Sequence, residues 1–493
     1  MNPQVSEDEE ILPQPIGDFR PIDVWQRHVN DIFYALRGSR VREYYQTFAS
    51  ADYRLAYALA EDYYRRLCRR ERSLKARQAS GAIPQEDHAG RTPAARLTVM
   101  EWGCGNGNLA ACFLDRLKAL DQEGAFYPRL QYVLIDRVEV LPAEAKSSPA
   151  LVPHEGHVTI VRADVEEVQG FADGSVDRIL CNELWSELPT KLMLRKEGDL
   201  QEEYVRPNVS EKKLVDITDW HGFVKAFEAK DQEALKGFPD FLDDVIWERG
   251  FRKVEAKDLS FRRTVTEFLK GIDEEVLLPV NLGACKTIQE AKRLLSSDAI
   301  GLSSFDAGTS DRDVLNDREK PCYSVHGGQF SFLVNLALLQ RVARHVGMEA
   351  VMIEPQKEFI GRSVNANVMS VMDVLASHPH IQKAESWELD RLILQTLHAL
   401  NRSYQSPYHR GIDYPLQDPI PPDQRDRLES LRRSLKPDGV PDTVAYLTEE
   451  EVLHVMPDLE SLGYDRDGIQ AVMMAPPQPV EYSHFFCAPS KER

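Results

Sequence analysis

Long apolar runs are missing from this sequence. None approaches the roughly 18 consecutive apolar residues that a membrane-spanning helix needs. The first ten residues carry acids where signal and transit peptides carry bases. We therefore expect a soluble, untargeted protein of the cytoplasm, with no membrane partner.

Cysteine is scarce and scattered. The seven cysteines are odd in number and are never spaced as Cys-x-x-Cys. This pattern favours neither a disulfide framework nor a zinc site, and it is typical of a reducing compartment. No metal site is predicted.

The sequence also lacks an excess of basic residues, and its formal net charge is −19. Such a charge repels phosphate backbones, so a nucleic-acid partner is not expected. The one basic run, at 65–77, has helical spacing and is interpreted as a solvated helix face. A protein substrate with a basic or neutral target fits the charge better.

A pattern of alternating strands and helices begins at Leu97. Short β-rich runs alternate with helical stretches there, which is typical of parallel strands joined by helices. The predicted strands are 97–101, 132–136, 158–164, 176–182, 299–306 and 350–354, with a final one at 482–487. The sequence therefore predicts an α/β protein with a mostly parallel sheet of about seven strands.

The predicted domains follow from changes in composition. They are an N-terminal tail, helices and linker at 1–96, a core at 97–360 with an insertion at about 210–295, a helical insertion or subdomain at 361–480, and a final strand and tail at 481–493. Residues 1–18 are predicted to be disordered, and 22–78 to form two helices. An apolar stripe from Phe332 to Val346, which follows Gln329, predicts one more helix before Gly347.

A glycine-rich loop follows the first predicted strand. Glu101 ends the strand, and Gly103, Gly105 and Gly107 then precede a helix. This brings bare backbone amides close to a ligand at a helix N-terminus. A nicotinamide fingerprint would need its third glycine at Asn108. The Gly-x-Gly-x-Gly spacing instead resembles the first motif of Rossmann-like methyltransferases, which implies S-adenosylmethionine as the cofactor.

Polar residues end the next three predicted strands. Asp136 can accept hydrogen bonds from both ribose hydroxyls, although it could instead cap a helix. Asp164 stands where such enzymes commonly contact adenine, and an N-cap role is equally open. Val165 would pack against the purine, and Asn182 reaches the same carboxyl edge beside the methyl donor.

A more specific resemblance starts at the fourth strand. Asn-Glu-Leu-Trp-Ser-Glu-Leu-Pro at 182–189, followed by the hairpin-like stretch at 191–205, is similar to the MidA family, which includes the mitochondrial complex I assembly methyltransferase. Three later pieces resemble the family in the same order: Ser-Ser-Phe-Asp-Ala-Gly at 303–308, Gly-Gln-Phe-Ser-Phe-Leu-Val at 328–334 and Gln-Lys-Glu-Phe at 356–359. Together these cover roughly 97–208 and 286–360.

This chain also departs from the family pattern. Ser186 stands where members usually carry Asp, and Ala307 where they carry Tyr. The expected Gly-Asp-Phe-x-Thr stretch is missing, and Tyr44-Tyr-Gln-Thr-Phe48 is the candidate for its place. Substrate contacts that depend on those residues are not carried over.

The resemblance implies methylation of a protein arginine. A guanidinium must be oriented by carboxylates, and Glu183 and Glu187 are the candidates because one helical turn ended by Pro189 would put both on one face. Structural capping by Glu183 and solvation of Glu187 are the alternatives.

A catalytically silent assembly factor that still binds the cofactor, and a small-molecule methyltransferase, are the alternative functions. The oligomeric state is open, with a homodimer as one option.

Overall fold

The computed structural model describes residues 13–38, 47, 52–80, 96–138, 148–254, 259–409, 414–476 and 478–490. It divides into two compact units. The first comprises 1–44, 185–288 and 308–345, and the second comprises 45–184, 289–307 and 346–493. Residues 1–12, most of the predicted linker at 80–96 and most of the stretch at 44–48 lie outside the described residues. The predicted disorder of 1–18 is wrong for Gln14–Pro15, because these residues pair as strand β1 with Val209 and Asn208. The predicted domain boundaries stay predictions.

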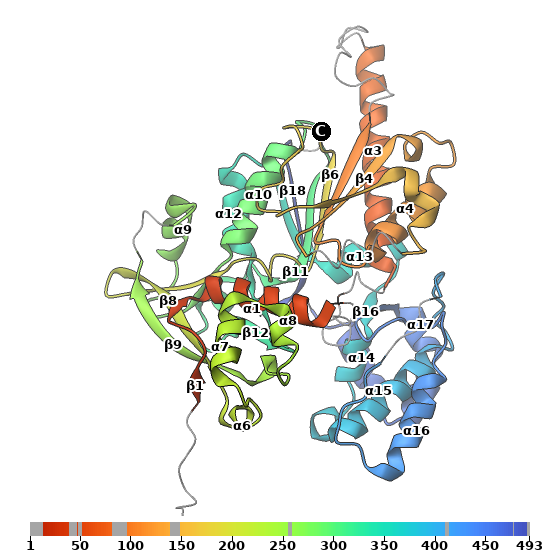
Figure 1. Cartoon of the computed structure of the whole chain (residues 1–493). Coiled ribbons are helices and arrows are strands. Elements are labelled where there is room, and N and C mark those ends of the chain that lie inside the picture. The colour runs from red at the N-terminus through yellow and green to blue at the C-terminus, as the bar shows by residue number, and fades with distance from the viewer. Residues whose placement is uncertain are drawn as a thin grey trace, which may run out of the picture. The chain divides into compact units, whose positions relative to one another are not determined.

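A mostly parallel sheet forms the core of the second unit (Figure 1). Its strand order is β15-β18-β11-β6-β3-β4-β5. The bounds are β3 Leu97–Trp102, β4 Leu130–Asp136, β5 Val158–Arg162, β6 Arg178–Asn182, β11 Gly301–Thr309, β15 Ala350–Pro355 and β18 Glu481–Ala488. This confirms the predicted Rossmann-like sheet, including the final strand returning to it.

The central strands are buried because helices cover them. In β3 five of six residues are buried, as expected for a parallel strand covered on both faces. Helices α3 (Arg54–Ala79) and α4 (Asn108–Leu120) pack together, and α13 (Gln356–Val364) packs against α3. Tyr63 and Phe113 join α3 to α4, with ring centroids 5.8 Å apart. Each large apolar side chain buried here contributes about 2 kcal/mol.

The last strand, β18, runs antiparallel to its neighbour β15, and Pro355 lies opposite Ser483. Because β18 is antiparallel, its first residues lie at the edge where the parallel strands end. The C-terminal strand therefore returns the chain to the carboxyl edge of the sheet.

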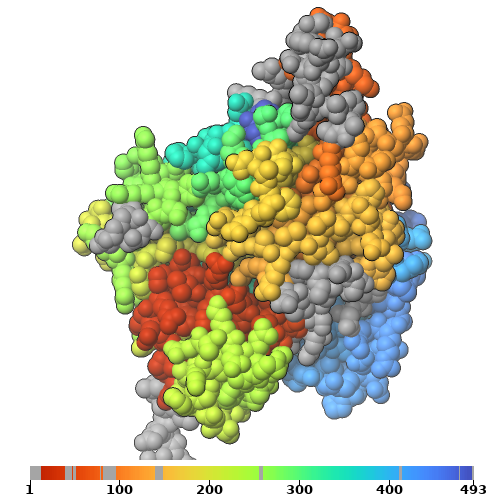
Figure 2. Space-filling model, turned by 45° about the horizontal axis from the view of Figure 1, so that its top comes forward, coloured from red at the N-terminus to blue at the C-terminus, as the bar shows by residue number. Residues whose placement is uncertain are grey.

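Helices form most of the second unit beyond α13. They are α14 Val371–Ala376, α15 Ser386–Leu400, α16 Pro422–Arg433, α17 Glu449–His454, α18 Met456–Ser461 and α19 Arg466–Met473, with η6 at Ile381–Lys383 and the short pair β16 Val368–Ser370 and β17 Tyr446–Thr448. They surround an apolar cluster that includes Leu397, Leu447 and Leu459. Figure 2 shows much of this region as a blue surface.

The first unit is built on a second sheet, of order β1-β8-β7-β10, with β2 and β9 also paired to β8. Its strands are β1 Gln14–Pro15, β2 Arg20–Pro21, β7 Lys191–Lys196, β8 Asp199–Val209, β9 Val245–Lys253 and β10 Leu278–Val280. Its helices are α1 Ile22–Arg37, α6 Glu211–Leu214, α7 Trp220–Ala229, α8 Gln232–Leu235, α9 Arg262–Leu269, α11 Arg312–Asn316 and α12 Leu336–His345, and α10 Leu282–Leu294 leads out of it. The pairing of β7 with β8 confirms the predicted hairpin.

One predicted helix begins later than expected. The stripe after Gln329 predicts a helix, but Gln329–Phe332 is strand β13, paired antiparallel with β12 (Tyr323–His326). The next two residues, Val334–Asn335, form β14, and helix α12 starts at Leu336. Cross-strand contacts such as Tyr323 with Phe332, at 5.3 Å between rings, favour the hairpin over the helix.

His28 in α1 gives the first unit a dependence on pH. Its Nε2 lies 2.8 Å from the Phe227 carbonyl oxygen, and its ring meets Trp25 edge-on at 5.0 Å. Burial lowers the pKa of His28 from 6.5 to about 4, and Lys230 and Arg20 lower it further, against the Phe227 hydrogen bond. The native state therefore binds fewer protons than the unfolded state between these values.

We predict that the free energy of unfolding falls by about 2 kcal/mol as the pH drops from 7 to 4.5, and that His28→Gln removes most of this loss. Stability is lost on acidification because the unfolded histidine gains its proton near pH 6.5, before the native one does. Urea unfolding at both pH values measures the effect. Exposed His221, replaced in the same way, is the control. An equal loss in His28→Gln and in the unmodified chain would contradict this origin.

Candidate functional site

The strand order of the second unit places a switch point at the carboxyl edge of its sheet. Strand β3 pairs with β4 on one side and with β6 on the other, and all of these pairs are parallel. The chain therefore runs from β3 to β4 and on to β5 toward one end of the sheet. From β6 it runs to β11, toward the other end. Ligands of open α/β sheets bind at such a switch point. Every predicted site residue except Glu187 belongs to this unit.

The glycine loop lies at this switch point and has the backbone that glycine allows. The φ angles of Gly103, Gly105 and Gly107 are 70°, 50° and 74°. A Cβ on Gly105 would meet nothing within 4 Å, so this glycine borders open space. Gly107 caps α4 without any side-chain hydrogen bond to the cap. The loop thus offers backbone and space to a ligand, which fits the predicted cofactor.

Glu101 lies beneath the loop and is buried. Its Oε2 accepts a hydrogen bond of 2.7 Å from the Tyr132 hydroxyl. Burial raises the pKa of Glu101 to about 8, and Asp136 adds to the rise, against the Tyr132 hydrogen bond. The carboxyl group therefore holds its proton at neutral pH and can donate a hydrogen bond at the base of the loop.

Asp136 ends β4 beside the same loop. Its Oδ1 accepts from the Val138 amide at 2.9 Å. Burial raises the pKa of Asp136, while hydrogen bonds from the backbone of Val138, Gly105 and Arg137 oppose the rise. The carboxylate is thus tied to the glycine loop, at the strand end where a ribose contact is predicted.

Asp164 and Val165 follow β5. The Asp164 carboxylate accepts from the Glu166 amide at 3.0 Å, and its carbonyl accepts from Glu167. The carboxylate thus caps a local turn, and no helix starts there. Val165 is buried, as packing against a purine would require.

Asn182 and Glu183 form the acidic tip of β6. Glu183 has a φ of 49°, and its amide donates to the Phe305 carbonyl at 2.7 Å. Asn182 Nδ2 donates to Glu183 Oε1 at 3.2 Å, and the Tyr482 hydroxyl donates to Oε2 at 3.3 Å. A Cβ on Gly103 would lie 3.0 Å from the side chain of Leu184. The glycine loop and the acidic tip are therefore neighbours.

Glu187 does not share a helical turn with Glu183. Residues 183–189 form bends and turns, and Glu183 has a left-handed backbone that a right-handed helix excludes. Glu187 belongs to the first unit, where its Oε2 accepts a hydrogen bond of 2.6 Å from the Tyr34 hydroxyl. The predicted shared helical face is wrong.

Residues 82–295 match the model of the family described as "Putative S-adenosyl-L-methionine-dependent methyltransferase". The match marks this chain as a methyltransferase. The family resemblance and the cofactor that the sequence predicted, S-adenosylmethionine, are confirmed by this match. No curated protein matches the chain.

Solved structures similar to this methyltransferase share little sequence with it. A COG1565 superfamily member from Burkholderia thailandensis bound to S-adenosyl-homocysteine is 15% identical, with a TM-score of 0.43, over 74% of this chain and 81% of that one. A second, native structure of a COG1565 superfamily protein from the same organism is also 15% identical, with a TM-score of 0.42, over 77% and 84% of the two chains.

Tyr482 is a residue of this methyltransferase site that sequence reasoning missed. Its contact with Glu183 spans 299 residues of sequence. The signal that could have found it was the predicted final strand, since an antiparallel last strand brings its first residues to the carboxyl edge. The sequence pattern does not reveal the direction of β18.

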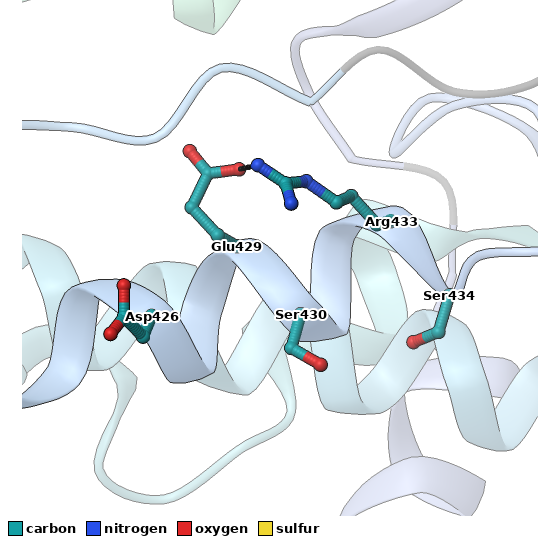
Figure 3. A pocket seen from close by; sticks show the side chains of 5 residues that line it. All are labelled: Asp426, Glu429, Ser430, Arg433 and Ser434. Carbon is teal, nitrogen blue, oxygen red and sulfur yellow. Dashed lines mark ion pairs between the residues drawn. The ribbon is translucent and has the colours of Figure 1, made fainter.

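Other features of the methyltransferase do not compete as sites. The hollow in Figure 3 lies on α16, where Glu429 Oε2 and the Arg433 guanidinium form an ion pair at 3.7 Å and the Ser434 hydroxyl donates to the Leu431 carbonyl at 2.9 Å. No cluster of metal-ligating side chains occurs among the described residues. Within the same part of the chain, no helix is long and apolar enough to cross a membrane.

Proposed function

We propose that this methyltransferase transfers a methyl group to an arginine of a protein substrate. The observation that carries the proposal is the Glu183 carboxylate, fixed at the tip of β6 next to the glycine loop. A guanidinium has five N–H donors and no acceptor, so a carboxylate is the group that can orient it and disperse its charge.

The residues of the loop and strand tips would hold the cofactor. S-adenosylmethionine supplies, when bound, an electrophilic methyl group on its sulfonium. We propose that the glycine loop and Glu101 form the base of the cofactor site. Asp136 would bind the ribose, and Asp164 and Val165 would contact the adenine. Asn182 would lie beside the methyl donor, as it already contacts Glu183.

Glu183 is the catalytic residue that we favour. Its backbone is held by Phe305 and its two carboxylate oxygens by Asn182 and Tyr482, so little rearrangement is needed to orient an acceptor. Glu187 remains a second candidate, but its contact with Tyr34 gives it a structural role already.

Label transfer tests the proposal. The chain is incubated with cell lysate and S-adenosylmethionine carrying an isotopic methyl label, and labelled residues are located by mass spectrometry. We predict labelled arginine, with the rate reduced about 30-fold in Glu183→Gln because a hydrogen bond to a charged group contributes about 2 kcal/mol. Glu187→Gln, compared in the same assay, tests the second candidate, and we expect it to reduce the rate less than Glu183→Gln does because Glu187 already contacts Tyr34.

The same experiment separates the alternatives. Label on a small molecule would favour a small-molecule methyltransferase, and cofactor binding without any label would favour a silent assembly factor. Arginine label at an undiminished rate in Glu183→Gln would remove the role of that residue. We further propose a cytoplasmic protein rather than a nucleic acid as the partner, because the net charge is −19.

A further inference from the structure

Tyr482 and Asp306 lie beside Glu183 at the carboxyl edge of the sheet. In parallel strands β6 and β11, Phe305 lies opposite Asn182, and the Glu183 amide donates to the Phe305 carbonyl at 2.7 Å, so Glu183 and Asp306 each follow a residue of this last pair. The Tyr482 hydroxyl donates to Glu183 at 3.3 Å. Burial raises the pKa of Tyr482, and the charges of Glu183 and Asp306 raise it further, as expected for a phenol near both acids.

Two buried amide oxygens extend this group. Asn182 Oδ1 and Gln356 Oε1 are buried and accept no hydrogen bond from the described residues. Gln356 is fully buried and follows Pro355, which lies opposite Ser483, the residue after Tyr482. Its Nε2 donates to the Tyr446 hydroxyl at 3.1 Å. Burial raises the pKa of Tyr446, the Gln356 hydrogen bond lowers it, and the charges of Asp373 and Glu183 raise it further.

The five residues Asn182, Glu183, Asp306, Gln356 and Tyr482, here called the acceptor cluster, are rich in hydrogen-bond acceptors. Buried acceptors without donors cost about 1–3 kcal/mol each, and a ligand with several N–H donors recovers that cost. Carboxylates favour such a ligand further if it is a cation. The chemistry therefore matches a guanidinium, which only donates.

We propose that the acceptor cluster binds the cationic side chain that is methylated, with Asp306 as the second carboxylate and Tyr482 as the positioning residue that holds Glu183. This inference rests on the proposed function and adds the residues that select the acceptor. It replaces Glu187 as the partner of Glu183, because Asp306 follows the residue paired with Asn182, whereas Glu187 accepts a hydrogen bond from Tyr34.

The test uses the full chain with Tyr482→Phe and Asp306→Asn, both nearly isosteric. We expect each to lower the initial rate of arginine labelling in lysate about 10-fold, while calorimetry gives an S-adenosylmethionine Kd within about twofold of the unmodified chain. Loss of the Tyr482 donor raises the pKa of the Glu183 carboxyl group, so the acidic limb of the rate profile should move up by about one pH unit.

Tyr464→Phe is the matched control, since it removes a buried tyrosine hydroxyl that contacts Thr396 at 2.7 Å. It should leave both the labelling rate and the acidic limb unchanged. Arginine labelling at full rate in both test variants, with an unmoved limb, overturns this inference and leaves the proposed function standing. Absence of arginine label from the unmodified chain overturns the proposed function and this inference with it.

Discussion

Gly105→Val should weaken S-adenosylmethionine binding about 100-fold or more. The Cβ of the new side chain would enter space that is open to 4 Å in the protein alone. If the cofactor lies along the loop, the added methyl groups occupy its place, and close packing leaves no room for both. Isothermal titration calorimetry with S-adenosylmethionine measures the loss.

The matched control is Gly170→Val. Gly170 has a φ of 84° and a Cβ there would also meet nothing within 4 Å. Both variants force a branched residue into a left-handed backbone, which costs about 1–2 kcal/mol of stability. Both should therefore unfold at similar, lower denaturant concentrations. Only Gly105→Val should lose the cofactor, and equal affinities in the two variants would show that the cofactor does not approach the loop.

Asp136→Ala should lower the affinity for S-adenosylmethionine by about 100-fold. Hydrogen bonds to a charged group contribute about 1.5–3 kcal/mol each, and a carboxylate at this strand tip can accept two from the ribose. The same carboxylate accepts from the Val138 amide, so its removal also loosens the backbone next to the glycine loop. The measurement is again calorimetric.

Two further variants separate these contributions. Asp136→Asn keeps an oxygen for the Val138 amide and loses the charge. We therefore expect its affinity for S-adenosylmethionine to lie between those of the unmodified chain and of Asp136→Ala. Asp164→Ala removes the turn cap on Glu166, and its effect on affinity should be less than about 10-fold. If Asp164→Ala weakened binding more than Asp136→Ala, the assignment of the ribose to Asp136 would be wrong.

Much of the core could be predicted because local patterns determine it. The strands around Glu101, Asp136 and Asn182 are evident from runs of buried apolar residues, which leave little choice in a parallel sheet. The start of the helix after Gln329 could not be predicted, because no local pattern determines it. Phe330 and Phe332 fit a strand and a helix about equally well, and only the partner strand β12 decides between them.

The sequence by itself determined the glycine loop and the acidic residues that end the strands, because the strand–loop–helix order and the need for left-handed backbone are local properties. Only the tertiary structure decided which acids meet. Glu183 and Asp306 come together through the pairing of β6 with β11, and Tyr482 joins them because β18 runs antiparallel. Strand pairing and direction depend on contacts between distant parts of the chain, so no local pattern contains them.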